Sequence, residues 1–137
     1  MNRYLLDTIV ISELRKARPH GAVLSWVGVQ DVGQLFLSAF TLGELQACVE
    51  KTRRQDPAKA GELNAWIEQL AASGQILPMD VACFREWGRL MEGKPLQLLG
   101  NAMIAATARV HDLIVATRNE ADFRHLGVRI VNPFKRR

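Results

Sequence analysis

The 137-residue sequence predicts an α/β fold, a three-layer α/β/α sandwich around a parallel sheet of about five strands. Two observations lead to this prediction. Short apolar strand patterns alternate with helix patterns along the whole chain, as they do in βαβ units. Polar residues also stand where apolar strands run into helices, and an open parallel sheet gathers functional side chains at that edge. No linker or repeat interrupts the pattern, so we expect a single domain over residues 1–137.

The first half of the chain predicts two strands and four helices. Apolar runs predict strands at Tyr4 to Leu6 and Leu35 to Ser38. Asp56 is a good N-cap before Pro57, and Ser73-Gly74 is a typical helix end. The predicted helices are Thr8 to Ala17, Ala22 to Val29, Thr41 or Leu42 to Arg54, and Asp56-Pro57 to Ala72.

The second half predicts three more strands and two helices. The apolar stripe between Val81 and Met91 indicates a helix, which Gly93-Lys94-Pro95 ends. Gly100 precedes a second helix, Ala102 to Val110, and a short turn is expected at Phe123 to Leu126. The predicted strands are Ile76 to Met79, Leu113 to Thr117 and Val128 to Val131.

The composition excludes several classes of protein. Apolar residues make up 48% of the chain, which excludes global disorder, and no apolar run approaches the length of a membrane span. Met1-Asn2-Arg3 leads directly into a strand pattern without a signal peptide, so we expect a cytoplasmic protein. Cys48 and Cys83 lack metal-binding partners in the sequence and are predicted to be buried free thiols.

The net charge is +4, and the pI of about 9.5 is compatible with binding to nucleic acid. Ordinary solvated Lys and Arg side chains explain such an excess equally well. The basic residues form three local clusters, and basic flanks around an acidic centre suit a nuclease. These clusters are Arg15, Lys16 and Arg18; Lys51, Arg53 and Arg54; and Lys135-Arg136-Arg137.

Four polar residues stand at predicted strand-to-helix junctions: Asp7, Glu44, Asn101 and Asp122. Each has a simple structural explanation when taken alone. Asp7, Asn101 and Asp122 are possible helix caps, and Glu44 in a first helical turn would suit the macrodipole. Together they predict carboxylates that converge at one sheet edge, where a cation would offset their mutual repulsion. Oxygen ligands without His or Cys favour Mg²⁺ or Mn²⁺, which indicates a metal-dependent phosphodiester enzyme.

The motifs around these residues resemble those of PIN-domain ribonucleases, specifically VapC-like toxins of type II toxin–antitoxin systems. The resemblance covers nearly the whole chain. It rests on Leu5-Leu6-Asp7-Thr8 with Val10-Ile11-Ser12-Glu13, Leu37-Ser38 followed by Thr41-Leu42-Gly43-Glu44-Leu45, Asn101-Ala102-Met103-Ile104-Ala105-Ala106-Thr107-Ala108, Thr117-Arg118-Asn119 with Asp122-Phe123, and Val131-Asn132-Pro133-Phe134.

The resemblance implies a site and a reaction. Asp7, Glu44, Asn101 and Asp122 would be the metal-site and catalytic residues, with Thr117 and Asn119 as supporting or substrate-side groups. One or two Mg²⁺ ions, or Mn²⁺, would activate a water for cleavage of structured RNA, leaving a 5′-phosphate and a 3′-hydroxyl. The implied substrate is a tRNA, commonly initiator tRNA, or a ribosomal RNA loop. The implied partners are a VapB-like antitoxin and a second copy of the chain in a homodimer, with no membrane.

Two positions depart from the family's pattern. Ile9 stands where an Asn usually follows Asp-Thr, and Asn101 stands where the family has an Asp. The loss of one negative charge predicts a folded but strongly impaired nuclease. A deliberate replacement, which the intact surrounding motif favours, or a natural variant would each produce this Asn.

Three other classes of function are alternatives to a nuclease. An aspartyl-phosphate phosphatase would need a second Asp at the position of Ile9. A receiver-like signalling domain would need a Lys near Thr117-Arg118-Asn119. A catalytically inactive module that binds RNA or antitoxin remains the alternative to a nuclease, because of Asn101.

Overall fold

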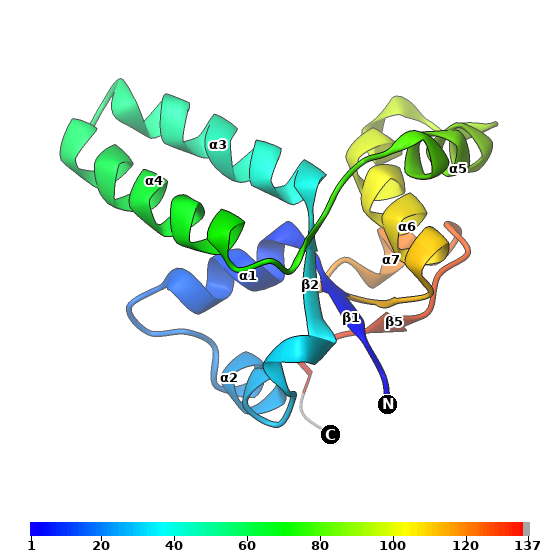
Figure 1. Ribbon diagram of the computed structural model, residues 1–137, viewed down its shortest axis with the longest axis horizontal. Coiled ribbons are helices and arrows are strands. Elements are labelled where there is room, and N and C mark those ends of the chain that lie inside the picture. Colours follow the sequence, from blue (N-terminus) through cyan, green and yellow to red (C-terminus); the bar gives the residue numbers. More distant parts are fainter. Residues whose placement is uncertain (136–137) are drawn as a thin grey trace.

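A five-stranded parallel sheet forms the centre of the molecule (Figure 1). The computed structural model describes residues 1–135. The strands lie in the order β3-β2-β1-β4-β5, so the first strand is central and the carboxyl ends of all five point the same way. Their bounds are β1 Tyr4–Leu6, β2 Leu35–Ser38, β3 Ile76–Leu77, β4 Ile114–Ala116 and β5 Ile130–Val131. The predicted fold class is confirmed.

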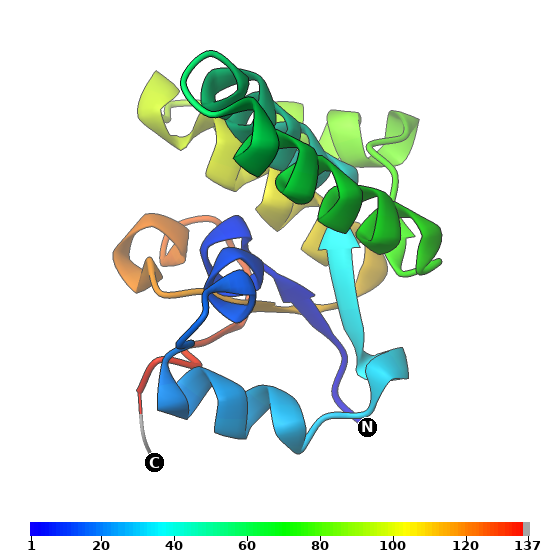
Figure 2. The same cartoon turned by 90° about the vertical axis from the view of Figure 1, so that its left-hand side faces the viewer.

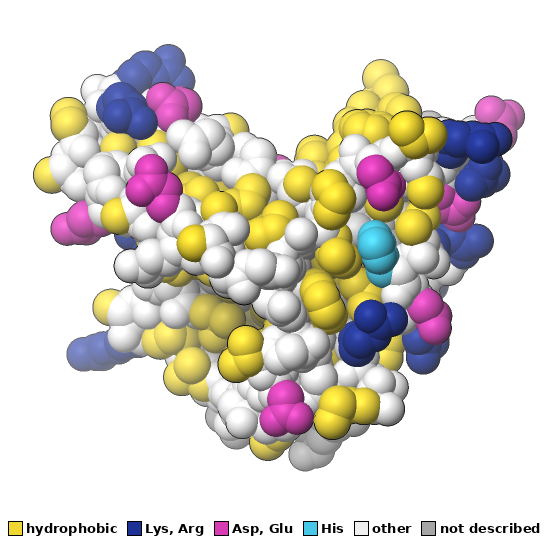
Figure 3. All heavy atoms as spheres, in the orientation of Figure 1, with side chains coloured by type: hydrophobic (Ala, Val, Ile, Leu, Met, Phe, Trp, Pro, Cys, Tyr) yellow, Lys and Arg dark blue, Asp and Glu magenta, His cyan; other side chains and the backbone are white. Residues whose placement is uncertain are grey.

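Helices cover both faces of this sheet (Figures 1 and 2). The α3–α4 pair and the α5–α6 pair project from the body, and the space-filling view shows a notch between them (Figure 3). Their bounds are α1 Thr8–Arg15, α2 Gly21–Gly28, α3 Ala39–Arg53, α4 Pro57–Ala72, α5 Val81–Met91, α6 Leu99–His111 and α7 Glu120–Phe123, with single 3₁₀ turns at Val32–Gln34 and Leu96–Leu98.

Alternation along the central strand divides the core into two parts. Tyr4 and Leu6 of β1 pack with buried residues of α1 to α4, whereas Leu5 between them packs with α6 and with Phe123 of α7. Successive side chains of a strand point to opposite faces, so three consecutive apolar residues serve both halves of the core. All three are buried, as expected for a parallel sheet covered on both sides.

The predicted starts of two helices were wrong. Helix α3 begins at Ala39 rather than at Thr41 or Leu42, because the Ser38 hydroxyl at the end of β2 accepts a hydrogen bond from the Phe40 amide at 3.0 Å. Glu44 therefore lies in the second turn, away from the amide groups of the helix terminus. Helix α6 begins at Leu99, which places Asn101 inside the first turn rather than at its N-cap.

Other boundaries were close to the prediction. Helix α5 spans Val81–Met91 as predicted, and Asp56 caps α4 by accepting from the Lys59 amide at 3.1 Å. Helix α1 ends at Arg15 instead of Ala17 because Lys16 adopts an extended conformation. The strands β3, β4 and β5 are shorter than predicted.

The two cysteines differ in exposure. Both are free, but only Cys83 is buried as predicted. Cys48 is exposed, so the prediction of a second buried thiol was wrong. It lies on the face of α3 that is turned away from the sheet and toward a surface groove described below.

Candidate active site

Asp7 is the buried centre of the candidate site. It directly follows β1 and caps α1, with Oδ1 accepting from the Thr8 amide at 2.8 Å. Oδ2 accepts from the Thr117 hydroxyl at 2.7 Å, and the side chain is almost fully enclosed. Asp7 therefore is a helix cap, as its sequence position allowed, and also contacts the residue that follows β4.

Burial raises the pKa of the Asp7 carboxyl above its usual range, because enclosure disfavours the charged form. The negative charges of Glu44 and Asp122 raise it further. The hydrogen bonds from Thr117 and Thr8 act in the opposite direction. The site thus has an excess of negative charge that a bound cation would relieve.

Glu44 approaches the site from α3 through a pair of threonines. The Thr8 hydroxyl lies 2.5 Å from Glu44 Oε1 and 3.1 Å from Thr41 Oγ1. A hydroxyl carries one proton, so Thr8 donates to the carboxylate and accepts from Thr41. Thr41 is fully buried, whereas Glu44 is exposed. A fixed hydroxyl pair therefore orients an otherwise mobile glutamate.

Asn101 and Asp122 form a second polar pair. Asn101 Nδ2 donates to Asp122 Oδ2 at 3.3 Å, which links α6 to α7. Neither residue is an N-cap: α6 is preceded by Leu98, and Asp122 lies inside α7 after Asn119. The cap explanations for Asn101 and Asp122 are therefore wrong.

Gly100 allows α6 to approach the start of α3 next to this pair. A Cβ atom at Gly100 would stand 2.8 Å from the Phe40 ring, closer than such contacts occur. The glycine before Asn101 is thus required by packing.

Thr117 and Asn119 extend the site from the end of β4. Thr117 is fully buried, and its hydroxyl donates to Asp7 while accepting from the Asn119 amide at 2.9 Å. Asn119 itself faces the surface pocket. Thr117 therefore supports Asp7, and Asn119 is available to a bound molecule.

One pocket of about 290 Å³ joins these elements. It contains three of the four residues predicted for the metal site, while Asp122 stands behind Asn101. Ile9, which is 40% exposed, forms an apolar part of its wall. The lining residues are Asp7, Thr8, Ile9, Ser12, Glu44, Asn101 and Asn119.

The donor chemistry of this pocket suits a hard divalent cation. The polar side chains that face it carry oxygen, from two carboxylates, two amides and two hydroxyls. Within residues 1–135, no three His, Cys, Asp or Glu side chains lie close enough together to hold a metal by themselves. The pocket thus offers two acidic ligands, Asp7 and Glu44, with Asn101 as a neutral third.

Sequence reasoning did not single out Thr8, Thr41 or Ser12. Thr8 and Thr41 lie within the family motifs, but nothing in the sequence pairs a residue of α1 with one of α3. Ser12 also lies within the first motif and follows Thr8 by one helical turn, which indicates that the two side chains share a face of α1.

Glu13 is the remaining acid of the first motif, and it is buried outside the pocket. It accepts from Lys16 Nζ and from the His20 amide, each at 2.9 Å. The hydrogen bond with Lys16 and the one from His20 hold the pKa of Glu13 below its usual value. Glu13 fixes the loop between α1 and α2.

The predicted basic clusters are partly neutralised. Lys16 pairs with Glu13, Arg53 pairs with Glu50 at 3.3 Å, and Lys135 pairs with Glu120 at 2.7 Å. The other two members of the C-terminal cluster, Arg136 and Arg137, lie outside the described residues. The clusters therefore offer less free positive charge than the sequence suggests.

A groove adjoins the pocket on the side of α1, α3 and α4. It has a volume of about 270 Å³ and shares Ser12 with the pocket. Its apolar floor includes Leu45, Leu63 and Trp66, and the Arg15 guanidinium lies 5.8 Å from the Trp66 ring centroid. Three cations, Arg15, Lys16 and Lys59, line it, and no acidic residue does. The lining residues are Ser12, Arg15, Lys16, Leu45, Cys48, Thr52, Lys59, Leu63, Trp66 and Ile67.

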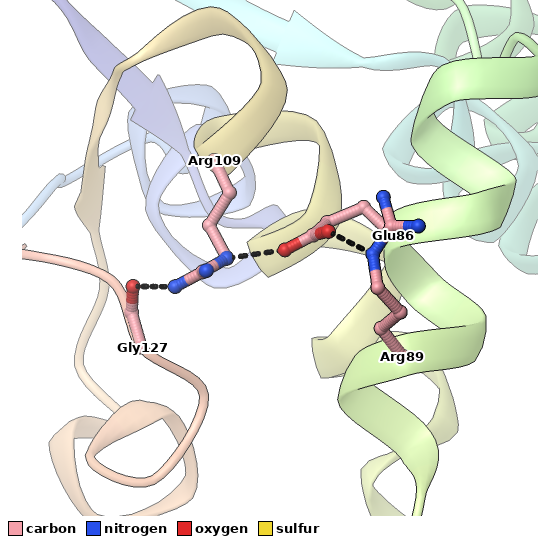
Figure 4. A network of polar contacts seen from close by, with 4 residues as sticks. All are labelled: Glu86, Arg89, Arg109 and Gly127. Atoms are coloured by element: carbon pink, nitrogen blue, oxygen red, sulfur yellow. Dashed lines mark hydrogen bonds and ion pairs between the residues drawn. The ribbon is translucent and has the colours of Figure 1, made fainter.

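Another pocket, of about 340 Å³, lies at the amino ends of β4 and β5 and is chemically different. Its central Arg109 pairs with Glu86, which also binds Arg89, and donates to the Gly127 carbonyl (Figure 4). The Arg109 guanidinium is thus engaged in ties between α5, α6 and the loop after α7. This end of the molecule carries structural bonds rather than free catalytic groups.

No helix within residues 1–135 is both long enough and apolar enough to cross a membrane.

The chain matches the model of the PIN domain over residues 4–128. It is 37% identical to VapC ribonuclease Y4jK of Sinorhizobium fredii, in an alignment that covers 96% of this chain and 97% of that protein. It is 33% identical to toxin FitB of Neisseria gonorrhoeae, over 95% of this chain and 97% of FitB.

A solved structure gives the same result. The crystal structure of FitAcB from Neisseria gonorrhoeae superposes with a TM-score of 0.83 at 32% identity, covering 96% of this chain and 98% of the other. The match thus includes the whole arrangement of sheet and helices that forms the pocket. This chain belongs to the PIN domain family and, within it, to the VapC- and FitB-type toxins of toxin–antitoxin systems.

Proposed function

We propose that the chain is a Mg²⁺-dependent endoribonuclease that cleaves structured RNA, either a tRNA such as initiator tRNA or a ribosomal RNA loop. The observation that carries this proposal is the convergence of Asp7, Glu44 and Asn101 on one pocket, where burial, together with the charges of Glu44 and Asp122, raises the pKa of Asp7. RNA of these classes is found in the cytoplasm, which is therefore the proposed place of action.

The metal-site residues in this proposal are Asp7, Glu44, Asn101 and Asp122. Asp7, Glu44 and Asn101 line the pocket, and Asp122 adjoins it through its hydrogen bond with Asn101. When bound, Mg²⁺ or Mn²⁺ would supply a water of lowered pKa and neutralise charge on the phosphate. Thr117 and Thr8 hold the two oxygens of Asp7 in fixed positions, and the Thr8–Thr41 pair orients Glu44. Asn119 is positioned to contact the RNA.

The amide at position 101 would weaken this activity. Asn101 brings an oxygen without charge, and its Nδ2 donates to Asp122. Asp122 is thereby engaged by a neutral donor instead of sharing a cation with residue 101. This hydrogen bond also supports the second candidate function, an inactive module that binds RNA or antitoxin.

Cleavage of initiator tRNA with and without Mg²⁺ tests the proposal, with Asp7→Ala as the control. Water is the nucleophile, so a 2′-deoxy nucleotide at the scissile position should still be cut, leaving a 5′-phosphate and a 3′-hydroxyl. Products with 2′,3′-cyclic phosphate ends, or full activity in EDTA, would exclude this mechanism. Binding without cleavage at any Mg²⁺ or Mn²⁺ concentration would favour the inactive module.

The proposed protein partner is a VapB-like antitoxin bound in the groove between α1, α3 and α4. The apolar floor of this groove suits an amphipathic segment, and its shared Ser12 leads directly into the pocket. A basic side chain of the antitoxin would then reach Asp7 or Glu44 in a charge-assisted pair.

Paired substitutions test this location. Leu63→Asp, at the groove floor, should abolish binding of a co-expressed antitoxin, because a buried unpaired charge is costly. Val81→Asp, at an exposed position of α5, should leave it intact. The opposite pattern would place the antitoxin on α5.

A homodimer is also part of this proposal. Several apolar side chains in and near α5 are exposed, with Val81 at 76%, Phe84 at 46% and Leu96 at 78%. Exposed apolar residues of this kind suit a surface between two copies. Light scattering on the purified chain measures its mass directly, and a monomer at micromolar concentration would contradict this part.

A further inference from the structure

Arg118 lies between two residues of the candidate active site. Its predecessor, Thr117, donates to Asp7, and its successor, Asn119, lines the pocket. Consecutive Cα atoms are about 3.8 Å apart, so the Arg118 backbone stands immediately behind the pocket wall. The side chain is exposed, and within residues 1–135 it makes no ion pair with a carboxylate. Arg118 thus carries an unneutralised positive charge on the segment that joins two residues of the site.

The guanidinium of Arg118 lies over the ring of Phe134, 4.5 Å from its centroid. This is a shorter distance than in the other two cation–π contacts, at 5.8 and 6.0 Å. A contact with the face of a ring restrains a guanidinium without consuming its N–H donors. The Arg118 side chain is therefore restrained while its donors remain available.

Phe134 is itself held in place from two sides. Asn132 Oδ1 accepts from the Phe134 amide, and Asn132 Nδ2 donates to Glu120 of α7, each at 2.9 Å. On the other side, His20 meets the ring edge-on at 5.4 Å, and the His20 amide is bound by the buried Glu13. The last motif of the chain therefore builds a fixed support for the Arg118 side chain.

We propose that Arg118, supported by Phe134, binds a backbone phosphate of the RNA next to the scissile one. This inference rests on the proposed ribonuclease function. The planar fork of an arginine matches the oxygens of a phosphate, and restraint before binding lowers the entropy that is lost on contact. An acidic pocket repels RNA, and a cation on the segment that joins Thr117 to Asn119 would offset part of this repulsion.

The simpler explanation is that Arg118 only shields Phe134 from water. The two explanations differ in what the charge does. A shield contributes to stability and leaves RNA affinity unchanged, whereas a phosphate ligand contributes to affinity and to its salt dependence.

The two explanations are distinguished by measuring the binding of a fluorescein-labelled RNA hairpin, which has the anticodon stem–loop sequence of initiator tRNA. Anisotropy titrations in EDTA, where cleavage is blocked, are repeated at several KCl concentrations. Arg118→Ala should weaken binding about tenfold and lower the slope of log Kd against log salt by about 0.7–1. Arg118→Lys should recover part of the affinity and the full slope, since it keeps the charge but not the fork. Phe134→Leu should lower affinity without changing the slope.

Arg129→Ala is the matched control. Arg129 is also an exposed arginine, but it pairs with Asp112 at 3.4 Å at the amino end of β5. Arg129→Ala should leave the RNA affinity and the slope of log Kd against log salt unchanged.

Equal effects of Arg118→Ala and Arg129→Ala, with wild-type binding intact, would overturn the inference and leave the proposed function standing. The same holds if Arg118→Ala lowers the Tm without weakening binding. Failure of the wild-type chain to bind the hairpin or the complete tRNA would overturn both.

Discussion

Asn101→Asp replaces a neutral amide by a carboxylate and so adds one negative charge to the candidate site. In the structure, Asn101 Nδ2 donates to Asp122 Oδ2 at 3.3 Å. A carboxylate oxygen at the place of that nitrogen would lose this hydrogen bond and repel Asp122. At this separation the repulsion is about 1 kcal/mol in a water-like dielectric, which suits a pair at the surface. The metal-free variant should therefore be less stable than the wild type, with a Tm lower by about 3–5 °C.

Mg²⁺ should reverse this order. A cation held by the site would offset the repulsion between residues 101 and 122, so the variant should bind Mg²⁺ more tightly than the Asn101 form. Binding at a hundredfold excess over Kd stabilises a protein by about 2.7 kcal/mol, which more than offsets the initial loss. Cleavage of initiator tRNA should rise at least about tenfold, equivalent to about 1.4 kcal/mol of transition-state stabilisation.

Two assays check this reasoning on the same preparations. Thermal unfolding is followed across a Mg²⁺ titration, and cleavage is measured at saturating Mg²⁺. Asn101→Ala is the control, because it removes the hydrogen bond without adding charge and should gain neither Mg²⁺-dependent stability nor activity. Equal Mg²⁺ responses and equal cleavage rates for the wild type and Asn101→Asp would refute the assignment of residue 101 to a metal site.

Three further predictions concern other parts of the structure. Because the folded-state pKa of Asp7 is raised, its ionisation destabilises the metal-free fold as pH rises through that pKa. Asp7→Asn should therefore raise the Tm of the metal-free protein at pH 7, and this gain in Tm should shrink as pH falls toward the unfolded-state pKa. A gain in Tm that grows at acidic pH would contradict a raised pKa for Asp7. Thr41→Val should leave the fold intact but lower cleavage by about threefold to tenfold, by removing the donor that orients Thr8 toward Glu44. Its effect should vanish in a Glu44→Ala background, and additive losses would contradict the relay. Gly127→Ala should destabilise the chain by about 1–2 kcal/mol in denaturant unfolding, because Gly127 has a φ of +66° and a Cβ there would collide with Arg109; an unchanged midpoint would contradict the need for glycine.

The order of strands and helices could be predicted from sequence because each apolar run is short, alternates with helical stripes and ends at a cap or a glycine. Asp7 could be placed because it directly follows a buried strand. The start of α3 was not predicted because Ser38 is both the last residue of β2 and the N-cap of α3. The start of α6 was not predicted because its N-cap, Leu98, has no side chain that can form a capping hydrogen bond.

Contacts between distant segments could not be predicted in the same way. The Thr8–Glu44 bond and the Asn101–Asp122 bond depend on how helices cross, and periodicity does not specify crossing. For the same reason the exposure of Cys48 was missed: a helical stripe does not say which neighbouring helix will cover it.

The bond between Thr117 and Asp7 joins residues 110 positions apart. During synthesis on a ribosome, the first motif therefore emerges long before β4 exists to pair with β1. At a translation rate of about 5–20 residues per second, several seconds pass between the synthesis of Asp7 and that of Thr117, whose hydroxyl holds the Asp7 carboxylate. A nascent or prematurely terminated chain lacking β4 holds no assembled site and should be harmless to the cell that makes it. The pocket, and any activity that depends on it, can therefore assemble only after translation has passed α7.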